Sequence, residues 1–530
     1  MMTLPRRALR KVRDALRGET AQTYFDIHDP RVLLPMLAHY GVDPSFDPTT
    51  STQRVQRVYE LRFDLRDVFP LALTPQGRGK YLEWLLAHGR PDLGLRDDEI
   101  LAWLFESDRD PSRGLAATWA LQPAWQRAVP DALTPSGWPR LKRWLAEEYN
   151  VISRWVRNAK LPPQPLINSA TGVNVLAHFR YPSGLQEAAV AAVKGLEAAG
   201  VATARRDLPV RFECDWADAE RYQSVEVCDT SIVCTAVNTF LDQFLPESGL
   251  HVRPGVRRIA IWYWELDRLP TEWVERIERT NLVDEVWAPT RFIADALASS
   301  LKLPIVPMLP GVELPPFAPQ PRSRFGLDES KFLFLFMFDM NSAMTRKNPL
   351  GLIEAFRRAF PDREAALAIK VSRASSDPAN RDALVAACRS VGVTLIDEVL
   401  PRGDVLALLN CADSYVSLHR SEGFGLTLAE AMLLGKPTIG TAYSGNLDFM
   451  TAETSYLVPF ELVPLTETLA PYPQGCRWAE PSVGDAAMLM RRVYENREES
   501  RRVGEAGRDH VRKLLSIAAA GERMASRLRA

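Results

Sequence analysis

The strongest fold signal in this chain is the stretch Ser421-Glu-Gly-Phe-Gly-Leu-Thr-Leu-Ala-Glu-Ala-Met-Leu-Leu-Gly-Lys-Pro437. The stretch Ser414–Leu418 just before it predicts a buried strand, and the pattern from Leu426 onward predicts a helix. Gly423 and Gly425 lie between the two and let the backbone come close to a ligand. A strand, a short turn and a helix form the repeating unit of parallel α/β sheets. We therefore predict a ligand site where this strand ends.

The predicted helix also favours an anion at its start. The free N–H groups of its first turn point back toward the strand, and the helix dipole attracts negative charge there. Glu422 lies in the turn and Glu430 lies further into the helix. Two carboxylates facing a phosphate would repel it, so we interpret both as acceptors for sugar hydroxyls on either side of the anion.

These residues resemble the signature of retaining glycosyltransferase family 4, which has the GT-B fold. The likeness rests on two glutamates with seven residues between them and the Gly-Phe-Gly turn. It implies that Glu422 contacts the donor sugar, that Glu430 binds the ribose and that backbone amides of the turn bind the diphosphate. The residues implied for the diphosphate are Gly423, Phe424, Gly425, Leu426 and Thr427. The alternative is an ordinary strand–helix unit with surface glutamates.

A second motif, Asp339-Met-Asn-Ser-Ala-Met-Thr-Arg-Lys-Asn-Pro349, follows the predicted strand Phe332–Phe338. Cationic side chains at such a point can neutralise a departing diphosphate. The resemblance implies that Lys347 binds phosphate. The family arginine five residues earlier is replaced by Ser342, so Arg346 is the candidate substitute. Both are alternatively solvated loop charges.

Two further loops resemble family loops around the donor. Thr441–Asn446 is small and polar, and the resemblance implies that Ser444 and Asn446 face the donor sugar. Pro182–Leu185 follows the predicted strand Val173–His178 and precedes the predicted helix Gln186–Ala199. It is similar to the family glycine loop, which implies donor phosphate contacts for Ser183 and Gly184. A plain turn is the alternative for either loop.

The acceptor side is less defined. Ile261-Trp-Tyr-Trp-Glu-Leu-Asp267 ends a predicted strand, Arg258–Trp264. Its aromatic rings can stack on a sugar and Glu265 can accept a hydroxyl hydrogen bond, which makes Glu265 a candidate catalytic residue. Alternatively, Trp262 and Trp264 belong to the core. Many family members carry a histidine here and this chain does not, so the acceptor-side catalytic residue stays open.

The first third of the chain has a different pattern. It is helical, and the segment Phe69–Gly77 recurs sixty residues later as Val129–Gly137, with Trp84 matched by Trp144. Each Thr-Pro predicts a helix start, with threonine as N-cap and proline as the first helical residue. Two copies are too few for a solenoid. We predict a small helical domain in which the two tryptophans are core or interface anchors.

The predicted fold class is therefore α/β GT-B, with two Rossmann-like parallel-sheet domains that face a cleft and an all-α domain before them. We place the helical domain at 1–165, the acceptor domain at 166–310 and the donor domain with its C-terminal helices at 311–530. The run Leu161–Pro165 is the predicted linker and Pro304–Pro316 the predicted interdomain connection. The remaining strands predicted in the donor domain are Ala365–Val371, Val393–Val399, Pro437–Gly440 and Ser455–Val458.

Composition limits the function classes. The 530 residues suggest two or three domains, and a net charge of -1 argues against a nucleic-acid partner. Six cysteines without a CxxC pair indicate reduced thiols in a cytoplasmic protein. The sequence predicts neither a signal peptide nor a membrane span. Asp108-Arg-Asp110 is interpreted as a solvated turn, so no metal or other cofactor is expected. The basic stretch Arg6–Arg17 either rests on the inner face of the cell membrane or is a solvated helix face.

The sequence thus predicts an enzyme that moves a sugar, with retention, from a nucleoside-diphosphate sugar to a hydroxyl of a glycan or lipid-linked glycan. The motifs Trp-x-Trp-Glu-Leu, Asp-Glu-Val-Trp-Ala-Pro and Arg-Lys-Asn-Pro are similar to those of bacterial surface-polysaccharide transferases. This similarity implies polysaccharide or lipopolysaccharide synthesis, with residues 1–165 contacting a membrane or an assembly partner. The alternatives are an inactive GT-B scaffold and an epimerase or hydrolase of sugar nucleotides. Base, sugar, linkage and acceptor stay open.

Overall fold

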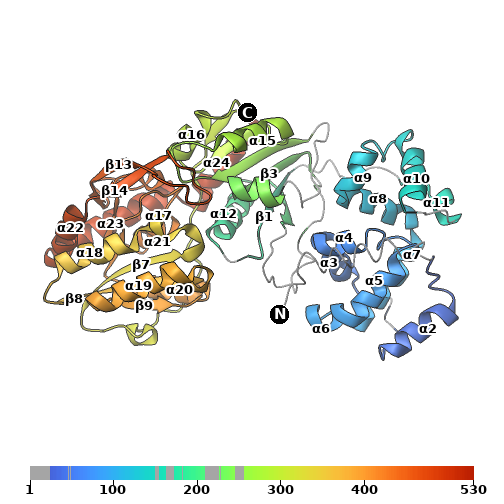
Figure 1. Cartoon of the computed structure of the whole chain (residues 1–530), viewed down its shortest axis with the longest axis horizontal. Coiled ribbons are helices and arrows are strands. Elements are labelled where there is room, and N and C mark those ends of the chain that lie inside the picture. Colours follow the sequence, from blue (N-terminus) through green and yellow to red (C-terminus); the bar gives the residue numbers. More distant parts are fainter. Residues whose placement is uncertain are drawn as a thin grey trace. The chain divides into compact units, whose positions relative to one another are not determined.

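A computed structural model describes residues 24–45, 47, 49–149, 154–162, 172–181, 183–208, 222, 226, 228–244 and 256–530 (Figure 1). The basic stretch Arg6–Arg17, most of the linker Leu161–Pro165, Pro182 and Cys214 lie outside these residues. The chain divides into two compact units. One comprises Met1–Gln186, Ala202–Val233 and Thr239–Arg258, and the other comprises Glu187–Val201, Cys234–Asn238 and Ile259–Ala530.

The first third is helical, as predicted. Its helices are α2 Pro30–His39, α3 Gln53–Leu61, α4 Phe63–Val68, α5 Arg78–Trp84, α6 Arg90–Leu93, α7 Asp97–Arg109, α8 Pro111–Leu121, α9 Pro123–Ala128, α10 Gly137–Glu148 and α11 Arg154–Asn158. A π-helical turn, Leu85–Gly89, joins α5 to α6.

The internal repeat is a structural repeat. In the first copy the amide of Thr74 donates to the carbonyl of Leu71 at 2.9 Å, and in the second the amide of Thr134 donates to that of Asp131 at 2.9 Å. The helices α5 and α10 begin only at Arg78 and Gly137, so the prediction that the Thr-Pro pairs start helices was wrong. Each threonine hydroxyl instead donates to the carbonyl three residues earlier and closes a turn before the helix.

The two repeat tryptophans anchor separate cores. Trp84 is partly buried and stacks on Tyr81, with ring centroids 5.9 Å apart, against the core of the first copy. Trp144 contacts Trp125 and Tyr149, each at 5.7 Å, within the core of the second copy. Each copy of the repeat therefore has an aromatic cluster of its own.

A first parallel sheet has the strand order β2-β1-β3-β4-β5-β6. Its strands are β1 Val173–Ala177, β2 Thr203–Asp207, β3 Thr230–Ala236, β4 Arg257–Tyr263, β5 Glu285–Ala288 and β6 Ile305–Pro307. Its helices include α12 Gly184–Ala198, α13 Val237–Thr239, α15 Thr271–Thr280 and α16 Arg291–Ala298. The predicted connection Pro304–Pro316 is partly wrong, because Ile305 pairs with Val286 and makes β6 an edge strand.

A second parallel sheet has the order β12-β11-β10-β7-β8-β9. Its strands are β7 Phe332–Asp339, β8 Ala365–Ser372, β9 Thr394–Asp397, β10 Ser414–Ser417, β11 Thr438–Thr441 and β12 Tyr456–Val458. Its helices are α17 Met344–Lys347, α18 Pro349–Ala359, α19 Pro378–Val391, α20 Arg402–Cys411, α21 Leu426–Leu433, α22 Val483–Glu495, α23 Arg497–Leu514 and α24 Ile517–Arg529. A separate antiparallel ribbon pairs β13 Phe460–Pro464 with β14 Arg477–Pro481.

The order of the second sheet places a ligand site. The chain runs outward from β7 through β8 to β9, then returns to β10 on the other side of β7. In open α/β sheets, ligands bind at such a switch point, beyond the carboxyl ends of the strands. The loops after β7 and β10 carry the two strongest sequence motifs, so the topology brings them together.

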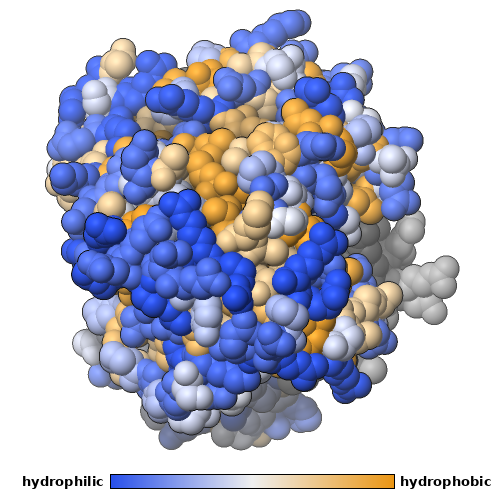
Figure 2. Space-filling model, turned by 90° about the vertical axis from the view of Figure 1, so that its left-hand side faces the viewer, coloured by the Kyte–Doolittle hydropathy of each residue, from blue (hydrophilic) through white to orange (hydrophobic). Residues whose placement is uncertain are grey.

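The outer surface of the C-terminal part is mixed in polarity. Figure 2 shows a mainly hydrophilic face with hydrophobic residues gathered near its middle. Exposed large apolar side chains of this part of the chain include Leu350 of α18 and Met488 of α22. Within the described ranges, we find no helix that combines the length and the apolar character needed to cross a bilayer.

Candidate functional site

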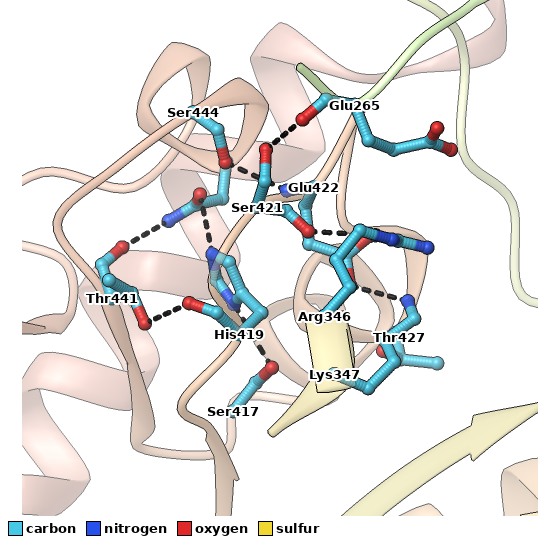
Figure 3. A network of polar contacts seen from close by, with 12 residues as sticks. Glu265, Arg346, Lys347, Ser417, His419, Ser421, Glu422, Thr427, Thr441 and Ser444 are labelled. Carbon is cyan, nitrogen blue, oxygen red and sulfur yellow. Dashed lines mark hydrogen bonds and ion pairs between the residues drawn. The ribbon is translucent and has the colours of Figure 1, made fainter. Parts of the chain in front are cut away.

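The structure brings Glu422, Lys347 and Arg346 together at the switch point (Figure 3). The ammonium of Lys347 donates to Oε1 of Glu422 at 2.5 Å. Nη1 of Arg346 donates to the carbonyl of Ser421 at 2.7 Å and lies 3.4 Å from Oε2 of Glu422. The side chains of Glu422, Lys347 and Arg346 are 13%, 16% and 4% exposed. Three predicted site residues therefore form one nearly buried charge cluster.

The charges in this cluster shift the pKa values of Glu422 and Lys347. Burial opposes the ionised form of Glu422, but the neighbouring charges of Lys347 and Arg346 outweigh burial and hold its pKa at about 2. Burial lowers the pKa of Lys347, and its bond to Glu422 works against that decrease. Glu422 is therefore a carboxylate at neutral pH, held between two cationic groups.

Backbone strain positions the cations. Ala343 and Asn348 flank α17 with φ of 59° and 54°, which is the left-handed region. Such residues cost of the order of 1 kcal/mol or more each and cluster at functional sites. The side-chain amide of Asn348 donates to the carbonyl of Leu418 at 2.9 Å, and the amide of Arg420 donates to the carbonyl of Arg346 at 2.8 Å. These bonds fasten the loop after β7 to the loop after β10.

The glycine turn presents backbone groups. Gly425 has a φ of 92° and precedes α21, whose first residues are Leu426 and Thr427. The amides of a helix's first turn have no partner within the helix. Phe424 is buried, with its ring 5.1 Å from that of Phe449. Its side chain thus belongs to the core, and only its backbone can serve a ligand.

The loop after β11 packs on this turn and forms hydrogen bonds with it. The amide of Glu422 donates to Oγ of Ser444 at 2.9 Å, and the amide of Gly445 donates to the carbonyl of Glu422 at 3.0 Å. A Cβ atom on Gly445 would lie 2.0 Å from the carbonyl oxygen of Gly423, so only glycine fits. The loop predicted to face the donor sugar therefore lies directly on the Glu422 turn.

His419 supports this contact and was missed by the sequence analysis. Its Nδ1 lies 3.0 Å from Oγ of Ser417, and its Nε2 lies 3.1 Å from Oδ1 of Asn446. Nδ2 of Asn446 donates to the carbonyl of Thr441 at 2.9 Å, so its Oδ1 is the acceptor and Nε2 carries the proton. Burial lowers the pKa of His419, which keeps the ring neutral. The sequence signal that could have found His419 is its place as a polar residue directly after the predicted buried strand Ser414–Leu418.

Glu265 reaches the cluster from the loop after β4. Its carbonyl accepts a hydrogen bond from the hydroxyl of Ser421, and its Oε2 accepts one from the hydroxyl of Tyr472 at 3.2 Å. The guanidinium of Arg346 lies 5.9 Å from the centre of the Tyr472 ring. Tyr472 lies between β13 and β14, where no motif pointed to a site, so sequence reasoning missed it.

The two tryptophans before Glu265 are core residues. Trp262 and Trp264 are 0% and 1% exposed. Trp264 packs on Trp273 and Tyr472, with ring centroids at 5.2 and 5.6 Å. These side chains present no free face to a sugar, which decides between the two interpretations in favour of the core.

Glu430 is buried beside a cation that the sequence analysis did not name. Its Oε1 accepts a hydrogen bond from Nη2 of Arg402 at 2.5 Å, and its Oε2 has no hydrogen-bond partner in the described part of the chain. Burial raises the pKa of Glu430, and Arg402 works against that increase. Its predicted ribose contact stays a prediction.

Ser183 and Gly184, predicted to contact the donor phosphates, lie at the start of α12. Ser183 precedes the helix and its hydroxyl accepts from the amide of Gln186 at 3.2 Å, while Gly184 is the first residue of the helix.

The interpretation of Asp108-Arg-Asp110 as a solvated turn was wrong. Asp108 pairs with the buried Arg78 at 2.5 Å, and Asp110 caps α8 through the amide of Arg113. In the ranges that the structure covers, no group of three or more His, Cys, Asp or Glu side chains is arranged to hold a metal ion.

Residues 322–510 match the family model described as glycosyl transferases group 1. The matched segment contains the second sheet and every contact among Arg346, Lys347, Glu422 and Ser444 described above. A search of curated proteins finds no match to the chain.

Solved structures resemble the chain beyond that segment. Sucrose-phosphate synthase from Thermosynechococcus elongatus is 16% identical over 68% of this chain and 98% of its own, with a TM-score of 0.50. HepE from Anabaena, solved with UDP and glucose, is 13% identical over 68% of this chain and 100% of its own, with a TM-score of 0.49. A glycosyltransferase from Rickettsia africae is 14% identical over 68% of this chain and 98% of its own, with a TM-score of 0.49. Together with the two parallel six-stranded sheets, the likeness to the synthase confirms the predicted GT-B fold class.

Proposed function

We propose that this protein transfers a sugar from a nucleoside-diphosphate sugar to a hydroxyl of a glycan or lipid-linked glycan, with retention at the anomeric carbon. The carrying observation is the buried cluster of Glu422, Lys347 and Arg346 beside the first turn of α21, within the segment that matches glycosyl transferases group 1. The family 4 resemblance supports retention and a place in bacterial polysaccharide or lipopolysaccharide synthesis.

Stabilisation of the leaving diphosphate is the main catalytic task. An ammonium has three donors, and Lys347 uses one of them on Glu422. Nε of Arg346 is buried and has no hydrogen-bond partner among the described residues. Together with the amides of Leu426 and Thr427, these donors can meet negative charge as the bond to the sugar breaks. Because they are fixed before the reaction, little reorganisation is needed.

The acidic residues hold the donor. Glu422 stays ionised at neutral pH and can accept hydrogen bonds from sugar hydroxyls, while the free Oε2 of Glu430 suits a ribose hydroxyl. Glu265 is the charged group on the acceptor side, and Tyr472 steadies its carboxylate. We assign Ser183, Gly184 and Asn446 to the donor phosphates and sugar on the resemblance alone, and residues 1–165 to a membrane or assembly partner.

The test measures release of nucleoside diphosphate from a panel of sugar nucleotides, with and without a bacterial glycan acceptor. Release that depends on the acceptor, with a product of unchanged anomeric configuration by NMR, supports the proposal. Release without acceptor would indicate a hydrolase, and interconversion of the sugar an epimerase. Binding of donor without any turnover would indicate a scaffold.

A further inference from the structure

Arg402, the first residue of α20, lies between two carboxylates from different elements. Its Nη2 donates to Oε1 of Glu430 at 2.5 Å, and its Nε lies 3.4 Å from Oε1 of Glu187 in the first turn of α12. The side chain of Glu430 is 1% exposed, and that of Arg402 is 29% exposed. One guanidinium is thus the principal counter-charge of a buried carboxylate at the candidate site.

The two oxygens of Glu430 are not equivalent. Oε1 is bonded to Arg402, whereas Oε2 is buried without a hydrogen-bond partner in the described residues. Leaving a buried acceptor without a partner is costly, so native proteins rarely leave one without a use. A bond that fixes Oε1 also fixes the direction of Oε2, because the carboxylate is planar and rigid.

Arg402 also favours the ionised form of Glu430. Burial favours the neutral acid and raises its pKa, the charge of Glu187 acts in the same direction, and Arg402 opposes both. Without Arg402, the buried carboxyl group would move further toward its protonated form. A protonated carboxyl accepts hydrogen bonds less strongly than a carboxylate.

We propose that Arg402 is a positioning residue for the donor nucleotide: it bonds Oε1 of Glu430 and thereby directs Oε2 toward the ribose hydroxyls. Arg402 itself need not touch the nucleotide. The carboxylate of Glu187 lies 3.4 Å from Nε of the same guanidinium and is a second negative charge beside it. This inference rests on the proposed function, because it assumes that a nucleoside diphosphate binds here.

The experiment compares the Kd of a ribonucleoside diphosphate with that of its 2′,3′-dideoxy counterpart, using whichever of UDP, GDP and ADP binds most tightly. The variants are Arg402→Ala, Arg402→Lys and Glu430→Gln. The matched control is Arg381→Ala, which removes an exposed arginine bonded to Asp397 at 2.7 Å. The wild-type protein and the control should prefer the ribonucleotide by about tenfold or more, as expected for hydrogen bonds to a charged acceptor.

In Arg402→Ala, the Kd of the ribonucleotide should rise to near that of the dideoxy form, whose own Kd should change little. Arg402→Lys keeps the charge with a less specific geometry and should retain part of the preference. A general structural defect would weaken both nucleotides equally, so the ratio of the two Kd values separates positioning from folding.

An Arg402→Ala or Arg402→Lys protein that keeps the full preference, while Glu430→Gln loses it, overturns the role of Arg402 and leaves the proposed function intact. If Arg402→Ala does not fold, the Arg402→Lys ratio decides. A wild-type protein that binds none of the three nucleotides removes the proposed function, and this inference with it.

Discussion

Replacing Glu422 by glutamine should destabilise the C-terminal part of the protein in a pH-dependent way. The carboxylate holds two nearly buried cations, and its pKa is about 2 against a reference value of 4.5. That difference corresponds to about 3 kcal/mol of stabilisation of the folded state at neutral pH. Because the folded-state pKa is depressed, the stabilisation is fully present above pH 4.5 and is lost as the pH falls toward 2.

The assay is calorimetric melting of the wild type and Glu422→Gln from pH 7 down to pH 3. At pH 7 the variant should melt roughly 6–12 °C lower, since about 1 kcal/mol shifts the melting temperature of a domain of this size by about 2–4 °C. The gap should narrow below pH 4.5. Glu354→Gln is the matched control, because Glu354 also has a pKa of about 2 but lies in surface ion pairs on α18. Such pairs contribute about 0–1 kcal/mol.

Two outcomes would refute this reasoning. An unchanged melting temperature at pH 7 would mean that Lys347 and Arg346 do not depend on Glu422 in the folded protein. A gap of constant size down to pH 3 would mean that glutamine disturbs packing, and that loss of the charge is not the cause.

The other predictions concern catalysis and domain structure. Activity should survive EDTA, because we assign phosphate stabilisation to Lys347, Arg346 and backbone amides; complete loss that magnesium or manganese restores would contradict this assignment. Tyr472→Phe should lower kcat about tenfold and leave nucleotide affinity unchanged, because it removes only the hydroxyl that bonds Glu265. An unchanged kcat, or weaker nucleotide binding, would argue against an acceptor-side role. Residues 166–530 expressed alone should fold and bind sugar nucleotide but lose acceptor use or partner attachment, checked by melting temperature and donor titration. An insoluble product would show that the helical region is needed for stability.

Local patterns predicted most of the second sheet. The run Phe332–Phe338 agrees with β7 to within one residue, because a strand buried on both faces is continuously apolar. The start of α21 at Leu426 was also predicted, since Gly425 can adopt the left-handed conformation that such a turn requires. The motifs around Glu422 and Lys347 could also be found from local sequence, because each is a short segment at the end of a predicted strand.

The Thr-Pro turns show where local patterns mislead. Thr-Pro is a common helix start in proteins. In both repeats of this chain, however, the threonine hydroxyl donates to the carbonyl three residues earlier, and the helix begins later. Competition between nearby hydrogen-bond partners selected the turn, and the residue types are compatible with either outcome.

Partnerships across the fold could not be read from the chain. Tyr472 bonds to Glu265 from 207 residues away, and Arg402 bonds to Glu430 from 28 residues away across two elements. No periodicity links such positions, because their distance depends on the strand order β10-β7-β8 and on how each helix packs on its sheet. The residue types alone are sufficient to locate the glycine turn and its two acids. Which cation neutralises which acid, and which carboxylate oxygen stays free, depends on long-range packing, because the same charges in other positions would pair differently.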